Sequence, residues 1–382
     1  MRLAGIVLAA FALGACALQP AAPDYTPLLA DGLFGPLPAL PQPAAALDAS
    51  PAMRAYLARE VVPRVAVRGE RQALLDALRE DIRLEYDAST TRTAAEAFAA
   101  RSGNCLSLVL MAAALARELD IPVRYQSVQG VDTWERLDGF AFRSGHVNLV
   151  LGTPLRNGWT VLRGDPDRVI DFMPSPQAAQ LPARPILEAT VLSMYYNNRA
   201  AETMAQGDLR GAYWWVRAAI RADPQYAPPY NTLGVVYLRR GALPLAERAL
   251  AHVLQQHPDS VEVLGNLAEV VARQGRTAEA DALRERRAEL APHPPFHFLD
   301  QGKAALARGD ARQALALFRK ELSRMPYDDE AHYGIALAQL RLGQVAAARQ
   351  SLARAMENSA RRERHALYAA KLEHLRGAHG SP

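Results

Sequence analysis

The residues of this chain with the clearest chemistry are its two cysteines, the only ones in 382 residues. Cys16 ends a short apolar leader, and Cys105 follows Ser-Gly-Asn at the start of an apolar helical stretch. A thiol in the first turn of a helix meets free backbone N–H groups and the positive end of the helix dipole, which favour the nucleophilic thiolate. Cys105 is therefore a candidate nucleophile, with a small core residue as the alternative.

A thiolate nucleophile needs a base and a group that orients the base. Between 48 and 188 the chain has one histidine, His146, at the start of a predicted strand. Asp171 lies in the apolar run Val-Ile-Asp-Phe, where a carboxylate needs a partner. The two are predicted to complete a Cys-His-Asp triad. Asp165 and Asp167, in the preceding turn, are alternatives to Asp171, and a structural histidine is the alternative for His146.

The elements that must position this triad change class along the domain. Apolar residues at helical spacing predict helices over 53–67, 73–86, 93–100 and 106–119. Runs rich in β-branched and aromatic residues predict strands over 122–128, 146–151, 159–162 and 169–172. Helices followed by an antiparallel sheet make an α+β domain. The long segment Gln129 to Gly145 is either a lid over the active site or an ordinary loop.

The order Cys105, His146, Asp171 resembles that of the transglutaminase-like superfamily of papain-type cysteine enzymes. The resemblance covers about 74–174 and includes the motifs Tyr86-Asp87, Arg92-Thr-Ala-Ala-Glu96, Ile121-Pro-Val-Arg-Tyr125 and Trp159. The departures from the family pattern are Asp120 in place of a glycine, Asn148 in place of an aromatic residue, and Pro174 three residues after Asp171.

The resemblance implies acyl transfer from an amide through a thioester on Cys105, with His146 as base and Asp171 as its orienting group. The backbone N–H of Cys105 and a second donor, Asn104 or Tyr125, are the expected oxyanion donors. Water as acceptor makes a protease or amidase, which we favour, and an amine makes a transglutaminase. The competing hypothesis is a non-catalytic assembly scaffold with a degenerate domain.

The C-terminal half repeats with a period of 34 residues. The period is carried by Pro224, Pro258, Pro292 and Pro326, by Gly207, Gly241, Gly275, Gly309 and Gly343, and by Ala212, Ala246, Ala280, Ala314 and Ala348. It resembles the tetratricopeptide (TPR) repeat, whose helix pairs stack into an all-α superhelix. We expect five repeats over 193–360, the third weakened by Arg284, and a capping helix over 361–376.

The repeats imply a protein or peptide partner in their concave groove. By family analogy the groove is lined by Asn197, Asn231, Val235, Leu238, Glu269, Lys303 and Tyr333. Trp214 and Trp215 are predicted to pack in the core rather than bind a partner.

The N-terminus resembles a bacterial lipoprotein leader. Met1-Arg2, an uncharged apolar run and Leu13-Gly-Ala-Cys16 match a signal peptide with a lipobox, so Cys16 is expected to be acylated. With Ala17 next, we expect the outer membrane, facing the periplasm. The proline- and alanine-rich stretch from Ala17 to Leu47 predicts an extended tether without a core, about 100 Å long at full extension.

The composition narrows the function classes further. The net charge is only +4, and the charge clusters mix both signs, so no nucleic-acid partner is expected. His293-x3-His297 lacks a third ligand, so we predict no metal site and no cofactor. The predicted organisation is a signal peptide (1–15), an acylated cysteine and tether (16–47), the transglutaminase-like domain (48–188), five repeats (193–360) and a capping helix with tail (361–382).

Overall fold

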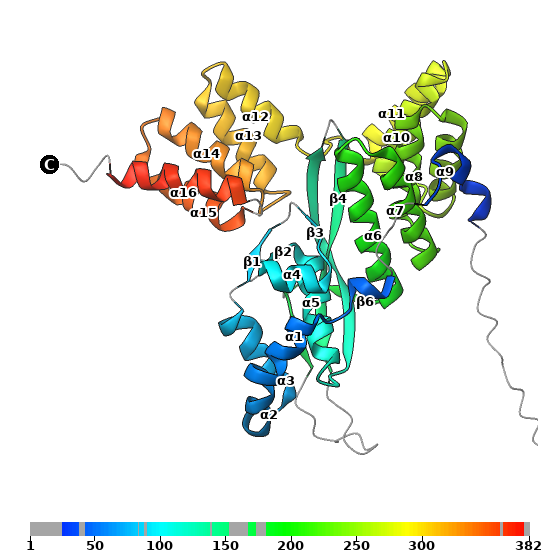
Figure 1. Ribbon diagram of the computed structural model, residues 1–382. Helices are drawn as coiled ribbons and strands as arrows, with labels where there is room; N and C mark the ends of the chain where they lie inside the picture. Colours follow the sequence, from blue (N-terminus) through cyan, green and yellow to red (C-terminus); the bar gives the residue numbers. More distant parts are fainter. Residues whose placement is uncertain are drawn as a thin grey trace, which may run out of the picture.

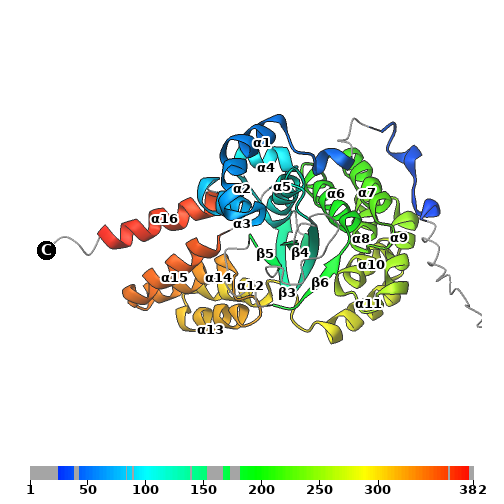
Figure 2. The same cartoon turned by 90° about the horizontal axis from the view of Figure 1, so that it is seen from below.

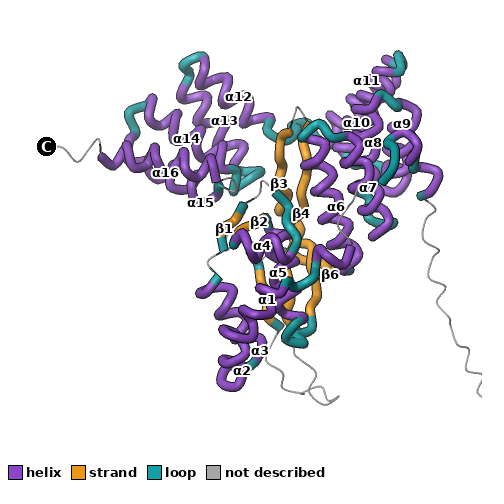
Figure 3. The backbone as a smooth tube through the Cα atoms, viewed as in Figure 1, coloured by secondary structure: helices purple, strands orange, loops and turns teal. Residues whose placement is uncertain are grey.

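The computed structural model describes residues 25–37, 43–82, 84–87, 90–137, 140–152, 167–172, 181–359 and 362–377. Strands gather at the centre of the molecule, and helices surround them (Figure 3). The predicted signal peptide, Cys16, the strand over 159–162 with Trp159, Asp165 and Pro174 lie outside the described residues. None of the described helices combines the length and the apolar character that crossing a membrane requires.

The first helices of the domain form two continuous rods. One comprises α1 (Pro51–Tyr56), a π-helical turn (Leu57–Val61) and α2 (Val62–Arg68), and the other α3 (Glu70–Asp76) with a π-helical turn (Ala77–Asp81). The first agrees with the predicted helix over 53–67. The second prediction, a helix through Tyr86, is wrong at its end, because Glu85–Tyr86 forms strand β1 and pairs in parallel with β2 (Ser102–Gly103).

Helix α5 (Cys105–Arg117) is the core helix of the domain. Every residue from Leu106 to Ala116 is buried, so this helix is apolar all round rather than amphipathic. It follows α4 (Ala94–Ala100), which begins with a capping box between Thr93 and Glu96. The predicted helices over 93–100 and 106–119 are therefore confirmed.

The main sheet is antiparallel with strand order β5-β4-β3-β6. Its strands are β3 (Val123–Leu137), β4 (Phe140–Leu151), β5 (Arg168–Ile170) and β6 (Ala183–Ile186). The expected lid or loop over 129–145 is wrong, because β3 and β4 extend through this segment as one long hairpin with a bulge between Val128 and Asp132 (Figure 1). Strand β6, which contains Pro185, was not predicted; a proline is tolerated there because β6 is an edge strand.

Helix pairs fill the C-terminal half. They are α6 (Glu188–Ala205), α7 (Leu209–Ala222), α8 (Pro228–Arg240), α9 (Leu243–Gln256), α10 (Val261–Arg273), α11 (Thr277–Leu290), α12 (His297–Ala307), α13 (Ala311–Leu322), α14 (Asp329–Arg341), α15 (Val345–Asn358) and the capping helix α16 (Arg362–Gly377). The five periodic glycines all have left-handed φ between 74° and 86°, so each turns the chain between two helices. The first pair begins at Glu188, before the predicted start at Ser193.

The repeats fall into two blocks with separate cores. The first block, α6–α11, shares one continuous buried cluster with the transglutaminase-like domain, whereas α12–α16 form two smaller clusters of their own. Helix α11 of the weak third repeat buries only Ala280. The two blocks lie on different sides of the long β3–β4 hairpin (Figure 1, Figure 2). Trp214 and Trp215 are buried in the first block, which confirms their packing role.

The N-terminal strap, residues 25–37, packs against the first block. Phe34 is buried and stacks on Tyr213 with ring centroids 4.1 Å apart. The Tyr213 hydroxyl donates to Asp31 Oδ1 at 2.6 Å, and the Tyr237 hydroxyl donates to the Leu28 carbonyl at 2.8 Å. In Figure 2 the strap is the blue segment beside α7 and α9.

The prediction of a coreless tether through Leu47 is therefore wrong for much of its length. Besides the strap, Ala46 and Leu47 are buried in the shared core. Composition alone missed this, because residues such as Phe34 and Leu47 pack against helices that lie far away in the sequence.

Candidate active site

Residues on both sides of Cys105 fix its place at the start of α5. Gly103 allows the chain to pass close to the helix, because a Cβ there would lie 2.6 Å from Ser107 Cβ. Asn104 is the N-cap, and its Oδ1 accepts from the Ser107 N–H at 2.9 Å. Cys105 itself is half-buried and is a free thiol. The motif Ser-Gly-Asn-Cys thus holds a half-buried cysteine at a capped helix N-terminus.

His146 and Asp171 meet at neighbouring strands. His146 Nε2 lies 2.7 Å from Asp171 Oδ1, and their side chains are only 1% and 8% exposed. Burial disfavours the imidazolium, but hydrogen bonds to Asp171 and Cys105, and the negative charge of both, raise the pKa of His146 from 6.5 to about 10. Since Nε2 is engaged by Asp171, the buried Nδ1 is the ring atom left to exchange a proton with Cys105. The structure thus brings the three predicted triad residues together.

Among the described residues, neither of the alternative carboxylates pairs with His146. Asp167 forms an ion pair with Arg124, and both side chains are about half-exposed. Asp165 lies outside the described residues. Asp171 is therefore the carboxylate that orients His146.

Asn148 is a site residue that the sequence analysis treated only as a departure from the family pattern. It is buried, and its Nδ2 donates to Asp171 Oδ2 at 3.4 Å. Because side chains alternate along a strand, a residue two positions after His146 lies on the same face of β4. That alternation is the signal that would have found it. Asn148 supports the carboxylate oxygen that His146 does not use.

Tyr125 does not serve as an oxyanion donor in this arrangement. Its hydroxyl lies 3.2 Å from Arg117 Nη2 and 3.3 Å from Glu188 Oε2. Burial raises the pKa of Tyr125, partly opposed by the Arg117 charge. Arg117 is the last residue of α5, so at 1.5 Å rise per residue it lies about 18 Å from Cys105. The prediction for Tyr125 is wrong because this tyrosine belongs to the opposite end of the helix.

The other predicted donor, Asn104, uses its side chain to hold the helix start. Its Oδ1 caps α5, and its Nδ2 donates to Thr91 Oγ1 at 2.8 Å. The amide is 9% exposed. Its observed role is therefore structural, and the backbone N–H of Cys105 is the candidate oxyanion donor left at the helix start.

Local contacts explain other residues of the motifs that resemble the family. Arg92 forms an ion pair with Asp87 at 3.0 Å, and Glu96 closes the capping box of α4. Asp120, where the family usually has glycine, adopts the left-handed conformation at φ 54°. Aspartate is one of the few residues with a side chain that tolerate this region, so the turn after α5 is kept.

No cluster of metal-ligating side chains occurs in the described part of the chain. His293 and His297 are both described, and their rings stack with centroids 5.0 Å apart beside Phe298. This pair packs near the start of α12 rather than around a common centre.

The predicted groove residues divide by exposure. Val235 and Leu238 are buried at 4% and 1%, so they belong to the core and not to an open groove, contrary to the prediction. Tyr333 packs on Tyr368 of the capping helix α16, with ring centroids 4.9 Å apart. The residues that remain accessible are Asn197, Asn231, Glu269 and Lys303.

Comparison with known proteins agrees with these two parts. Residues 57–162 match the transglutaminase-like superfamily, and residues 231–292 and 305–371 match tetratricopeptide repeats. No curated protein matches the chain significantly.

Several solved structures resemble part of this chain. The crystal structure of MamA is 20% identical and covers 44% of this chain and 91% of that one, with a TM-score of 0.25. TTC0263, a thermophilic TPR protein of Thermus thermophilus, is 18% identical and covers 47% and 99%, with a TM-score of 0.28. PilF of Pseudomonas aeruginosa is 20% identical and covers 50% and 93%, with a TM-score of 0.26. This chain is a transglutaminase-like domain followed by tetratricopeptide repeats.

Proposed function

We propose that the chain is a cysteine acyl-transfer enzyme that hydrolyses a protein or peptide amide, with its repeats recruiting a protein partner. The observation that carries this proposal is the geometry at His146. Its Nε2 is bound to Asp171, and its buried Nδ1 is left for the half-buried thiol of Cys105. A Cys-His-Asp set of this kind is the arrangement of an activated thiol nucleophile.

The raised pKa of His146 keeps its ring as imidazolium at neutral pH, and a neighbouring positive charge favours the nucleophilic form of a thiol. The thiolate adds to the amide carbonyl carbon, and the backbone N–H of Cys105 donates to the resulting oxyanion. As the C–N bond breaks, His146 Nδ1 gives its proton to the leaving amine, and a thioester remains on Cys105. Asp171 keeps the ring oriented through both steps.

Resolution of the thioester decides the reaction type. His146, now neutral, takes a proton from water, the hydroxyl adds to the thioester carbonyl, and the C–S bond breaks to give a carboxylate and the Cys105 thiolate. An amine in place of water would give a new amide. Hydrolysis is the simpler outcome, since it needs no second binding site.

Hydrolysis, transamidation and a lack of activity can be distinguished without a known substrate. The purified chain is incubated with a proteome-derived peptide mixture in water enriched in oxygen-18, and the products are read by mass spectrometry. Hydrolysis predicts new peptide C-termini that carry oxygen-18 in the wild type and not in Cys105→Ala. New amide cross-links without labelled C-termini would replace hydrolysis by transamidation, and identical products from both chains would reject the enzyme.

The scaffold hypothesis is favoured by a different observation, the buried state of the site. The His146 side chain is 1% exposed, so a substrate reaches the dyad only through the half-buried thiol. Complementation separates the two functions: a Cys105→Ala chain with full biological activity, together with loss of activity in Asn231→Ala or Lys303→Ala, would support the scaffold.

We further propose that Cys16 is acylated and anchors the chain in the outer membrane, facing the periplasm. The docked strap shortens the connection, because Tyr25 lies only nine positions after Cys16. At about 3.3–3.6 Å per residue these span at most about 30 Å, so the first repeats stay near the lipid surface. Radiolabelled palmitate should enter the wild type and not Cys16→Ala; no incorporation into the wild type, or a Cys16→Ala chain that stays in the membrane fraction, would contradict the anchor.

A further inference from the structure

The catalytic helix and the first repeat meet at one buried residue, Thr91. Its side chain is 1% exposed. Thr91 Oγ1 accepts from Asn104 Nδ2 at 2.8 Å, its N–H donates to Glu202 Oε1 at 2.7 Å, and its carbonyl accepts from Arg199 Nη1 at 3.3 Å. Asn104 is the N-cap of α5 and directly precedes Cys105. Thr91 therefore links the residue beside the nucleophile to two side chains of α6.

The two α6 side chains form a pair that is costly to bury. Arg199 and Glu202 form an ion pair at 2.8 Å, with side chains 30% and 20% exposed. Burial raises the pKa of Glu202, and its contacts with Thr91 and Arg199 lower it in part. A partly buried carboxylate needs such partners to offset its desolvation. The Thr91 N–H is one of these partners.

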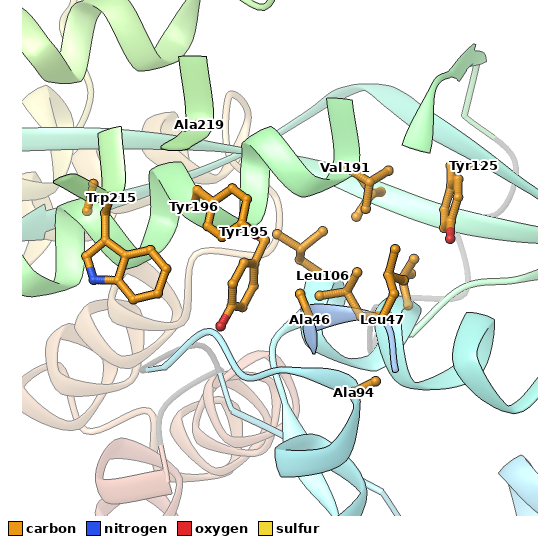
Figure 4. Close-up of a cluster of buried hydrophobic side chains, with 14 of the residues drawn as sticks. Ala46, Leu47, Ala94, Leu106, Tyr125, Val191, Tyr195, Tyr196, Trp215 and Ala219 are labelled. Atoms are coloured by element: carbon orange, nitrogen blue, oxygen red, sulfur yellow. The ribbon is translucent and has the colours of Figure 1, made fainter. Parts of the chain in front are cut away.

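Apolar contacts join the same two helices. Leu106, the residue after Cys105, belongs to the same buried cluster as Val191 and Tyr195 of α6. Figure 4 shows these side chains together, with Ala46 close to Leu106. The first turn of the catalytic helix is therefore held by α6 on its apolar side as well as through Thr91.

We propose that Glu202 and Arg199 are positioning residues for Cys105, so that helix α6 of the first repeat supports the nucleophile through Thr91 and Asn104. This inference rests on the proposed function of Cys105. An N-cap stabilises the start of its helix through one orientation of its side chain, and the hydrogen bond to Thr91 fixes that orientation for Asn104.

The test measures the rate constant of Cys105 alkylation by iodoacetamide in the full chain. Thr91→Val removes the acceptor for Asn104 while keeping the side-chain shape, and Glu202→Ala removes the acceptor for the Thr91 N–H. Glu202→Gln keeps an oxygen for that N–H and serves as the conservative rescue. Glu279→Ala, which removes a carboxylate of α11 that forms an ion pair with Arg276, is the matched control. Far-ultraviolet circular dichroism confirms that each variant is folded at the temperature used.

We expect Thr91→Val and Glu202→Ala to lower the rate constant about tenfold, the size expected for loss of a helix cap. Glu202→Gln should lose less, and Glu279→Ala should react as the wild type does. Folded Thr91→Val and Glu202→Ala chains that react at the wild-type rate would overturn the inference while leaving the nucleophile in place. A wild-type thiol no faster than free cysteine would instead reject the nucleophile itself, and the inference with it.

Discussion

The two repeat blocks differ in what they pack against. The first, α6–α11, shares one buried core with the transglutaminase-like domain and carries the N-terminal strap, whereas α12–α16 bury their apolar residues among themselves. Repeat proteins are stabilised by nearest-neighbour interfaces, so each block depends on the neighbours it has. The first block is thus a structural part of the half that carries the candidate triad, and the second is a separate stack of repeats.

The largest effects should come from removing a core ring in each block. Tyr195→Ala and Phe318→Ala each delete a side chain that is at most 2% exposed, and each should cost about 3–5 kcal/mol of unfolding free energy. Only Tyr195→Ala should also slow alkylation of Cys105, because Tyr195 shares its cluster with Leu106. Denaturant unfolding and alkylation rates check this, and an equal loss of reactivity in both variants would contradict the separation of the blocks.

Two glycines at close approaches give a smaller, matched contrast. A Cβ at Gly103 would lie 2.6 Å from Ser107 Cβ, and one at Gly334 would lie 2.5 Å from Phe318 Cζ. Gly103→Ala and Gly334→Ala should each cost about 1–3 kcal/mol through overpacking. Alkylation should fall in Gly103→Ala alone, since Ser107 is on the first turn of the catalytic helix. Normal reactivity in a folded Gly103→Ala chain would show that the close approach does not position Cys105.

The docking of the strap on the first block can be tested by removing one of its contacts. Asp31→Ala removes the acceptor for the Tyr213 hydroxyl and the ion pair with Arg217. Because the Asp31 side chain is 45% exposed, we expect a loss of only about 1 kcal/mol in strap docking. Hydrogen exchange should then be faster over 25–37 and unchanged over α12–α16. Unchanged exchange over 25–37 would mean that Asp31 does not hold the strap.

The smallest expected effect lies at the turn after α5. Asp120 holds a left-handed φ of 54°, which costs a residue with a Cβ about 1 kcal/mol or more relative to glycine. Asp120→Gly should raise the unfolding free energy by about 0.5–1 kcal/mol, reduced by the greater freedom of glycine in the unfolded chain. Thermal unfolding measures it, and a lower melting temperature would show that the aspartate side chain has a role of its own.

The sequence predicted what local patterns determine. The helix start at Cys105 followed from its capping residues, and the repeats followed from glycines and prolines at a fixed period. The strands over 122–128 and 146–151 were predicted and lie within β3 and β4, but their extension through 129–145 as a hairpin was missed, because that part lacks a clear alternating pattern. The strap was missed because its few apolar residues are stabilised only by distant partners such as Tyr213.

Within the site, the same limit applies. Cys105, His146 and Asp171 were predicted from residue types in a known order, and Asp171 was separated from its neighbours only by the measured contact with His146. The prediction for Tyr125 was wrong because its place in the Ile121–Tyr125 motif does not show which end of α5 it lies beside. Thr91 carries no local signal at all, since its role comes from side chains more than one hundred residues later.

The most direct test of the central claim is the pH dependence of Cys105 alkylation. Because the pKa of His146 is raised to about 10, its imidazolium persists across neutral pH and stabilises the thiolate throughout that range. We expect the wild-type rate constant to stay nearly level from about pH 6.5 to about 9. In His146→Ala the rate constant should rise through about pH 8.5, as for an ordinary thiol. A wild-type rate constant that itself rises through about 8.5 would contradict the thiolate–imidazolium pair.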